Sequence, residues 1–97
     1  MKIVKIEKLV GEYNIWELEK TPYAKFKIKV YVNENGSYSG YTNLQIIDEN
    51  GDFYCAVGWG ETQEMALNDT LNNFSEMLSK KDVWEEKDFC CADSYDF

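Results

Sequence analysis

The sequence predicts an α+β fold in which an antiparallel meander of four to five strands packs against one long amphipathic helix. Three observations support this prediction. Apolar and polar residues alternate in consecutive segments between residues 23 and 59, two Asn-Gly turns separate those segments, and a helical period replaces the alternation after residue 60. The 97 residues suffice for one hydrophobic core. We therefore expect a single domain over residues 1–81, followed by an acidic, aromatic-containing C-terminal segment over residues 82–97.

The N-terminal part is expected to form a first hairpin. Residues 3–9 and 13–19 are strand-like and flank Val10-Gly11-Glu12, although the apolar residues of the first segment do not alternate regularly. A short helix at the N-terminus is the alternative. Thr21-Pro22 then separates this part from the next strand, because proline cannot donate to a strand ladder.

Three strands joined by tight turns follow. The clearest spans residues 23–32, where five apolar residues alternate with three lysines and two tyrosines, so one face should be buried and the other solvated. The turn at residues 33–36 leads to a strand over 39–47, and the turn at 48–51 leads to a third strand that ends near Trp59. We expect Trp59 to lie in or near the core.

The final predicted element is an amphipathic helix that packs across the sheet. Leu67, Leu71, Phe74 and Leu78 recur at spacings of four, three and four residues, which predicts a helix of about 18 residues. Thr62 is the expected N-cap, since its hydroxyl can accept a hydrogen bond from a free backbone N–H group.

The residue inventory argues against enzymes, cofactors and metals. The chain has no His and no Arg, the side chains that carry out most acid–base catalysis and most bidentate phosphate binding. Cys55, Cys90 and Cys91 lack metal-ligand spacing and a His base, so we expect inert thiols. The glycines at 58 and 60 lack the Lys of a phosphate loop, and residues 48–52 lack the closing Glu of a calcium loop.

No targeting or membrane signal is apparent in the sequence. The chain has no apolar run near the roughly 20 residues that cross a bilayer, and its N-terminus lacks the apolar stretch of a signal peptide. We therefore expect a cytoplasmic protein that does not bind membranes.

The strongest functional indication is the charge distribution. Residues 1–32 carry seven Lys against four Glu, a net charge of +3, whereas residues 33–97 carry three Lys against fourteen acids, a net charge of −11. Such a surface repels nucleic acid and attracts basic partners. The hypothesis is a non-enzymatic inhibitor, a monomer or homodimer, that mimics nucleic acid and occupies the nucleic-acid site of a basic protein.

The residues expected to bind this partner combine carboxylates with aromatic anchors. The carboxylates are Asp69, Glu76, Asp82, Glu85, Glu86, Asp88, Asp93 and Asp96, and the aromatic anchors are Trp84, Phe89 and Tyr95. Charge should speed association, and buried aromatic contacts should slow dissociation.

Two other classes of function stay open. Lys25, Lys27 and Lys29 alternate with apolar residues on one strand between Tyr23 and Tyr31, a pattern that also occurs in modules that bind single-stranded nucleic acid. An assembly subunit that associates with itself through an exposed strand edge is the other alternative.

Residues 60–67, Gly-Glu-Thr-Gln-Glu-Met-Ala-Leu, resemble the G-x-T-x-E-x-A-L corner of HicB-type antitoxins. The resemblance implies a small domain of β-meander and helix that masks a basic RNase toxin. In general character, as a short acidic chain rich in Lys, Glu and Asn, the sequence also resembles small phage-encoded inhibitors of the anti-CRISPR type. Both resemblances imply binding to a basic nucleic-acid enzyme in the cytoplasm of a bacterial host cell.

Overall fold

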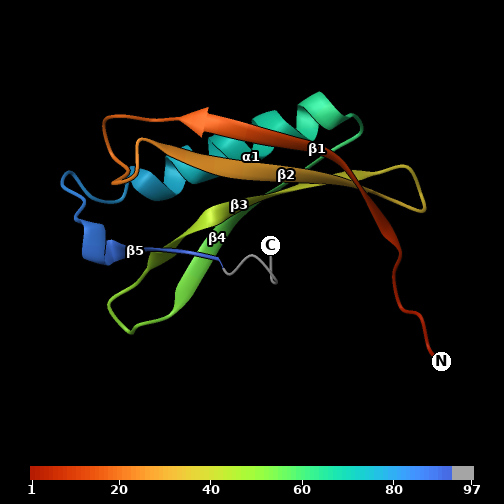
Figure 1. Cartoon of the computed structure of the whole chain (residues 1–97), viewed down its shortest axis with the longest axis horizontal. Helices are drawn as coiled ribbons and strands as arrows, with labels where there is room; N and C mark the ends of the chain where they lie inside the picture. Colours follow the sequence, from red (N-terminus) through yellow and green to blue (C-terminus); the bar gives the residue numbers. More distant parts are fainter. Residues whose placement is uncertain (93–97) are drawn as a thin grey trace.

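The computed structural model describes residues 1–92, which form one antiparallel sheet and one long helix (Figure 1). The elements in chain order are β1 (Glu7–Trp16), β2 (Lys25–Asn33), β3 (Tyr38–Ile47), β4 (Phe53–Gly60), α1 (Gln63–Leu78), the short 3-10 helix η1 (Glu86–Asp88) and β5 (Phe89–Cys91). The strand order is β1-β2-β3-β4, with β5 paired to β3. This confirms the predicted α+β class, with five strands and one helix packed on the sheet.

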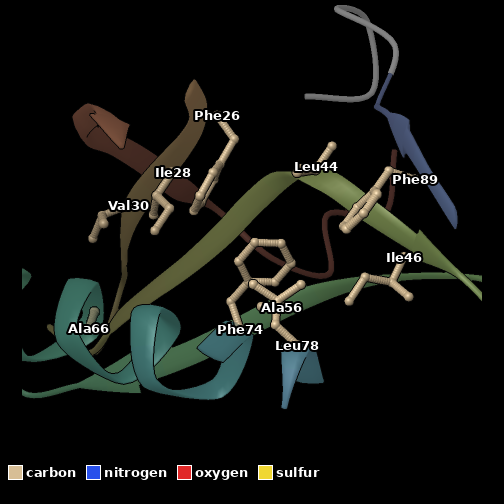
Figure 2. Close-up of a cluster of buried hydrophobic side chains, with 10 residues drawn as sticks. All are labelled: Phe26, Ile28, Val30, Leu44, Ile46, Ala56, Ala66, Phe74, Leu78 and Phe89. Carbon is tan, nitrogen blue, oxygen red and sulfur yellow. The ribbon is translucent and has the colours of Figure 1, made fainter. Parts of the chain in front are cut away.

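The core lies between α1 and one face of the sheet, and Figure 2 shows its ten side chains converging from both layers. The predicted alternation in the second strand is confirmed, because Phe26, Ile28 and Val30 are buried. The Phe26 ring meets the Phe74 ring of α1 edge-on, with 4.9 Å between the ring centroids. These aromatic and aliphatic contacts hold the helix against the centre of the sheet.

Two glycines allow α1 to approach the sheet closely. Gly40 of β3 lies directly opposite Gly58 of β4, and both face Thr70 of the helix. A Cβ atom at Gly58 would lie 2.3 Å from the backbone nitrogen of Thr70. The hydroxyl of Thr70 donates to the Ala66 carbonyl at 2.7 Å, so the buried polar group is satisfied inside the helix.

The sheet divides in the middle of β3. β2 pairs with β3 only as far as Thr42, and β5 takes over the same edge from Leu44 to Ile46. Asn43 joins the two branches, because its side-chain Oδ1 accepts from the Lys27 N–H at 2.7 Å and its carbonyl accepts from the Ala92 N–H at 2.7 Å. On the other side of β3, the Thr42 hydroxyl accepts from the Ala56 N–H at 2.9 Å across an irregularity in the ladder.

The prediction of an N-terminal hairpin is wrong. Residues 7–16 form one continuous strand, and the extra residue at Val10 is accommodated by a β-bulge between Leu9 and Gly11. The apolar residues Ile3, Val4 and Ile6, which do not alternate regularly with Leu9, lie before the strand begins. Residues 1–6 adopt neither helix nor strand.

The prediction that Trp59 lies in or near the core is also wrong, since this side chain is 64 % exposed. Neighbouring strand residues face opposite sides of a sheet, and the small residues Ala56 and Gly58 are the ones that face the helix. The predicted N-cap is confirmed, because the Thr62 hydroxyl accepts from the Met65 N–H at 3.1 Å. The helix is 16 residues long, and no helix of the described chain is long and apolar enough to cross a membrane.

Candidate protein-binding surface on the β4 edge

The described part of the predicted acidic segment carries much less negative charge than its carboxylates alone suggest. Residues 82–92 hold four acids and one Lys, a net charge of −3, and Lys80 and Lys81 directly before them reduce the net charge of residues 80–92 to −1. Lys81 forms a salt bridge with Asp88 at 3.4 Å, and Lys87 forms one with Glu85 at 3.1 Å. The hydrogen bond from the Glu85 backbone N–H, with Lys81 nearby, lowers the pKa of Asp88. Asp88 therefore has a structural role at the start of η1.

Two of the predicted aromatic anchors pack on the protein itself. Phe89 is a buried member of the core, so in this structure it is not available to a partner. The Trp84 ring lies 5.4 Å from the Phe89 ring, and its indole N–H donates to the Leu78 carbonyl at 2.8 Å. Trp84 thereby closes the C-terminal end of α1. The segment proposed as a separate unit is thus joined to the domain as far as residue 91.

The other predicted partner-binding residues fall into three groups. Asp82 and Glu86 are exposed near the end of α1, and Glu76 is exposed on α1 itself. Asp69 is half-buried on α1. Asp93, Tyr95 and Asp96 lie outside the described residues.

A larger concentration of negative charge lies along β4. Between residues 30 and 79 the sequence contains eight acids and no lysine. Seven of these carboxylates belong to the β3–β4 turn, the corner after β4, or α1, which packs chiefly on β4. They are Asp48, Glu49, Asp52, Glu61, Glu64, Asp69 and Glu76. No cation within this stretch neutralises them.

Two side chains of α1 cover the outer edge of β4. Asp69 accepts from the Trp59 backbone N–H at 2.9 Å, and Asn73 donates to the Val57 carbonyl at 2.7 Å. The spacing of four residues puts Asp69 and Asn73 on one side of the helix, one above the other. A carboxylate and an amide thus occupy the backbone groups that another strand would need, so this edge presents side chains rather than a free ladder.

Exposed apolar side chains lie on the same elements as these carboxylates, with Phe53 and Trp59 on the face of β4 away from α1 and Tyr54 on the face toward it. Phe53, Tyr54 and Trp59 of β4 and Met65 of α1 each have at least 50 % of their surface exposed. We call these four residues and the seven carboxylates the β4-edge surface. It has the combination of acids and aromatics that was expected of the C-terminal segment.

The electrostatic effect of the carboxylates is evident at Tyr54. The charges of Asp48 and Asp52 raise the pKa of the Tyr54 hydroxyl, which lies beside the β3–β4 turn. Asp48 also accepts from the backbone N–H groups of Asn50 and Asp52 at 2.9 Å each, so its carboxylate is held in place by the turn. This end of the β4-edge surface is therefore a fixed site of negative potential.

The residues predicted to bind a partner include two members of this surface, Asp69 and Glu76, and none of its aromatic members. Trp59 was assigned to the core, and Phe53 and Tyr54 were not among the predicted site residues. The absence of lysine over residues 30–79 is the signal that could have directed attention to β4.

A large concavity borders this surface. It has a volume of about 1010 Å³ and lies between the β3–β4 hairpin and the residues that follow α1, with Tyr54, Met77, Val83 and Trp84 among its lining residues. Lys80, Lys81 and Lys87 line it together with four acids, so it carries no dominant sign of charge.

The cysteines and carboxylates give no sign of metal or nucleophile chemistry in the described part of the chain. No group of three or more potential metal ligands occurs among residues 1–92. Cys55, Cys90 and Cys91 are free thiols. Burial raises the pKa of Cys90, whose Sγ lies 3.3 Å from Gln45 Oε1, and this lowers its thiolate fraction.

The sheet face opposite α1 carries the predicted lysine row. The Lys25 ammonium lies 5.3 Å from the Trp16 ring centroid, and Lys27 forms a salt bridge with Glu12 at 3.7 Å. Tyr31 and Tyr41 form an edge-to-face pair on the same side, 5.8 Å apart. Glu7 and Glu12 share this face, so its three lysines are offset by two carboxylates.

Comparisons with family models, curated proteins and solved structures gave no match to this chain. The corner that resembles HicB-type antitoxins has a local structural explanation. A Cβ atom at Gly60 would lie 2.5 Å from Met65 Cβ, Thr62 caps the helix, and Ala66 is fully buried. These residues permit a tight junction between strand and helix.

Proposed function

We propose that this protein is a non-enzymatic inhibitor that binds a basic nucleic-acid-binding protein through the β4-edge surface and occupies its nucleic-acid site. The observation that carries the proposal is the number of carboxylates on the turn, the corner and the helix that flank β4, a strand that has no acid of its own. At roughly 3.3 Å per residue, the eight residues of this strand span about 26 Å. Phosphates of one DNA strand are roughly 3.4 Å apart, so about eight fit in that length, close to the number of carboxylates in this surface.

The exposed aromatic residues supply apolar contact area, which the carboxylates do not. Trp and Tyr are enriched among the residues that contribute most to protein–protein binding, and Trp59 and Tyr54 stand among the carboxylates. Carboxylates should accelerate association with a basic groove, and the aromatic side chains should slow dissociation. Inhibition of a bacterial defence nuclease by a phage protein is the biological role that fits this mechanism, as with inhibitors of the anti-CRISPR type.

The test compares two variants with the same change in charge. One variant is Glu61→Gln with Glu64→Gln and Glu76→Gln, and its matched control is Asp82→Asn with Glu85→Gln and Glu86→Gln. Each protein is immobilised and exposed to a nuclease-treated bacterial lysate, then eluted with duplex DNA or with rising salt. We expect DNA to release basic nucleic-acid-binding proteins from the wild type and the control, and the β4-edge variant to capture much less.

The purified captured protein then allows kinetics to be measured. At low salt, the β4-edge variant should associate with it about tenfold more slowly, whereas the control should stay within about twofold of the wild type. Equal association rates for the two variants, or captured proteins that DNA does not displace, would contradict the proposal.

The antitoxin alternative uses the same surface on a different partner. A toxin that acts on RNA would also be basic, so the identity of the captured protein separates an antitoxin from an inhibitor of a defence nuclease. Capture of a small RNase whose activity is lost in the complex would favour the antitoxin.

Binding of single-stranded nucleic acid is a second candidate, favoured by the lysines and aromatic rings on the sheet face opposite α1. Stacking on Trp16 or Tyr41 with charge from Lys25 and Lys27 is the mechanism such modules use. Filter binding with single-stranded DNA and RNA at physiological salt tests it directly. Retention that is lost in Lys25→Gln with Lys27→Gln would favour this candidate over the inhibitor, which should not be retained.

A further inference from the structure

The edge of the sheet formed by β1 differs from the β4 edge in having no cover. β1 is a terminal strand of ten residues, and its outer side pairs with no other strand of the described chain. Its interior contains no proline to prevent pairing. Figure 1 shows the N-terminal residues leaving β1 and projecting away from the body of the protein.

Residues 1–6, which we call the N-terminal arm, have the composition of a strand but no strand to pair with. Ile3, Val4 and Ile6 are each more than half exposed. Among the described residues, the Ile6 N–H joins the arm to a distant part of the chain by donating to Glu34 Oε1 at 3.3 Å. Three exposed branched apolar residues within four positions form an apolar patch that another surface can cover.

A groove with an apolar side lies at the opposite end of β1. Its volume is about 280 Å³, and it is lined by the apolar residues Ile15, Phe26, Leu71, Phe74 and Leu78 and by the polar residues Glu17, Glu19, Lys20, Ser75 and Ser79. The groove therefore opens between the end of β1 and the helix. The arm leaves from the other end of the strand, so it cannot cover this groove in its own molecule without reversing direction.

We propose that β1 is a dimer interface at which a second copy of this chain pairs antiparallel and lays its N-terminal arm over this groove. Antiparallel pairing of β1 with itself brings the start of each strand to the end of the other. Each arm then lies beside the groove of the partner copy. The two sheets join into one, and both arms are covered at once.

The faces of the sheet and the charges along β1 are compatible with one alignment of the two copies and disfavour a neighbouring one. In β1, Glu7, Leu9, Glu12, Asn14 and Trp16 share the face opposite the helix, because the bulge at Val10 shifts the alternation by one. In this alignment, Leu9 of one copy lies opposite Glu12 of the other copy, and Glu7 lies opposite Asn14. Residues that are paired across the two copies then lie on the same face of the joined sheet. An alignment shifted by two residues would put Glu7 of each copy opposite Glu12 of the other copy. Repulsion between these like charges disfavours that alignment.

This alignment extends along the N-terminal arm. Ile6 lies opposite Ile15 and faces the helix side, where the groove is. Lys5 lies opposite Trp16, a ring that already has the Lys25 ammonium 5.3 Å from its centroid. Val4 shares the helix side with Ile6, so these two side chains of the arm reach the groove of the other copy when the two strands pair antiparallel.

The first test is the concentration dependence of the molecular mass of the full chain. Sedimentation from about 1 μM to about 500 μM covers the affinities expected of a modest interface. We expect a monomer–dimer equilibrium that Ile6→Lys weakens at least tenfold. The control Val83→Lys adds the same charge at another exposed apolar position, after α1, and should change the dissociation constant less than twofold.

A monomer at all concentrations, or a dimer that Ile6→Lys leaves intact, would overturn the proposal. Ile6 is exposed in the monomer, so circular dichroism should confirm that the variant retains its fold. Hydrogen exchange at the two extreme concentrations gives a second readout that needs no variant. Exchange should slow at high concentration in the arm and β1, whereas slowing confined to β4 would contradict the assignment.

Discussion

The two edge strands of the sheet, β4 and β1, present different groups to a binding partner. At β4, Asp69 and Asn73 hydrogen-bond to the outer backbone groups of Trp59 and Val57, and only side chains face outward. At β1, the described chain provides no such cover, and an apolar arm continues from the strand. One edge is therefore suited to recognition through charge and aromatic contacts, and the other to strand pairing.

The difference follows from where α1 lies. The helix contacts β4 far more than it contacts β2, and its Asp69 and Asn73 side chains hydrogen-bond to backbone groups of β4. At β1, the Gln63 amide of the helix donates to the Tyr13 side-chain hydroxyl at 2.6 Å, not to a backbone group. A single helix cannot cover both edges of a sheet of this width. Three kinds of substitution test this difference: those that move the helix, those that uncover the β4 edge, and those near β1.

The largest effect is expected when the helix is displaced from β4. In Gly58→Val, the new side chain would begin 2.3 Å from the Thr70 backbone nitrogen, so α1 must move outward or the strand must distort. We expect the free energy of unfolding to fall by about 3 kcal/mol or more, measured by urea denaturation. If the loss were below about 1 kcal/mol, the close approach of helix and strand would be wrong.

Gly36→Ala is the control for this substitution. Gly36 has a positive φ of 83° but no atom within 4 Å of a Cβ atom, so only backbone strain opposes the change. The expected loss is about 1 kcal/mol, clearly smaller than at Gly58.

A smaller effect is expected when the β4 edge is uncovered. Asn73→Ala removes the amide that donates to the Val57 carbonyl at 2.7 Å. Stability should fall by about 1 kcal/mol, and the freed strand edge should promote association at high concentration, measured by light scattering.

Asn72→Ala supplies the matched control, because Asn72 directly precedes Asn73 on the same helix and its side chain is exposed. The two substitutions change helix propensity equally, so any difference between them reports on the edge contact. Equal stability and equal scattering would mean that Asn73 does not protect β4.

The smallest effect is expected in the loop after β1, and it depends on pH. Burial opposes the charge of Glu17, but hydrogen bonds from the backbone N–H groups of Lys20, Thr21 and Glu19 outweigh it and lower the pKa of this carboxyl. A lowered pKa in the folded state stabilises the protein above the ordinary value of 4.5, and this contribution is lost as pH falls through the folded-state pKa. Glu17→Gln should therefore cost about 1 kcal/mol at pH 7 and almost nothing in strong acid.

The control is Glu19→Gln, an exposed neighbour whose substitution should change stability by no more than about 0.5 kcal/mol at either pH. Urea denaturation at pH 7 and at pH 3 measures both variants. A loss at Glu17 that is the same at both pH values would show that the charge of this carboxylate is not what stabilises the loop.

Local patterns in the sequence predicted the elements whose causes are local. The alternation over residues 25–32 and 39–47, the Asn-Gly turns and the Thr62 cap were confirmed, because each depends on neighbours within a few residues. The predicted strand start at Tyr23 was wrong, since β2 begins at Lys25 and Ala24 is exposed with a positive φ of 53°. The N-terminal hairpin failed because a bulge is stabilised by pairing with β2, which lies some 20 positions further along the chain. Of the candidate site, Asp69 and Glu76 were selected and Trp59 was missed.

The sequence by itself determined the class of fold, the strand and helix periods, and a net charge that favours basic partners. Only the tertiary structure decided which carboxylates gather and which are neutralised, because Lys81 and Lys87 meet Asp88 and Glu85 through folded contacts. It also decided that Phe89 belongs to the core and that α1 covers one edge of the sheet and leaves the other open. Charge and hydrophobicity are properties of residues, whereas a surface exists only after distant residues have been brought together.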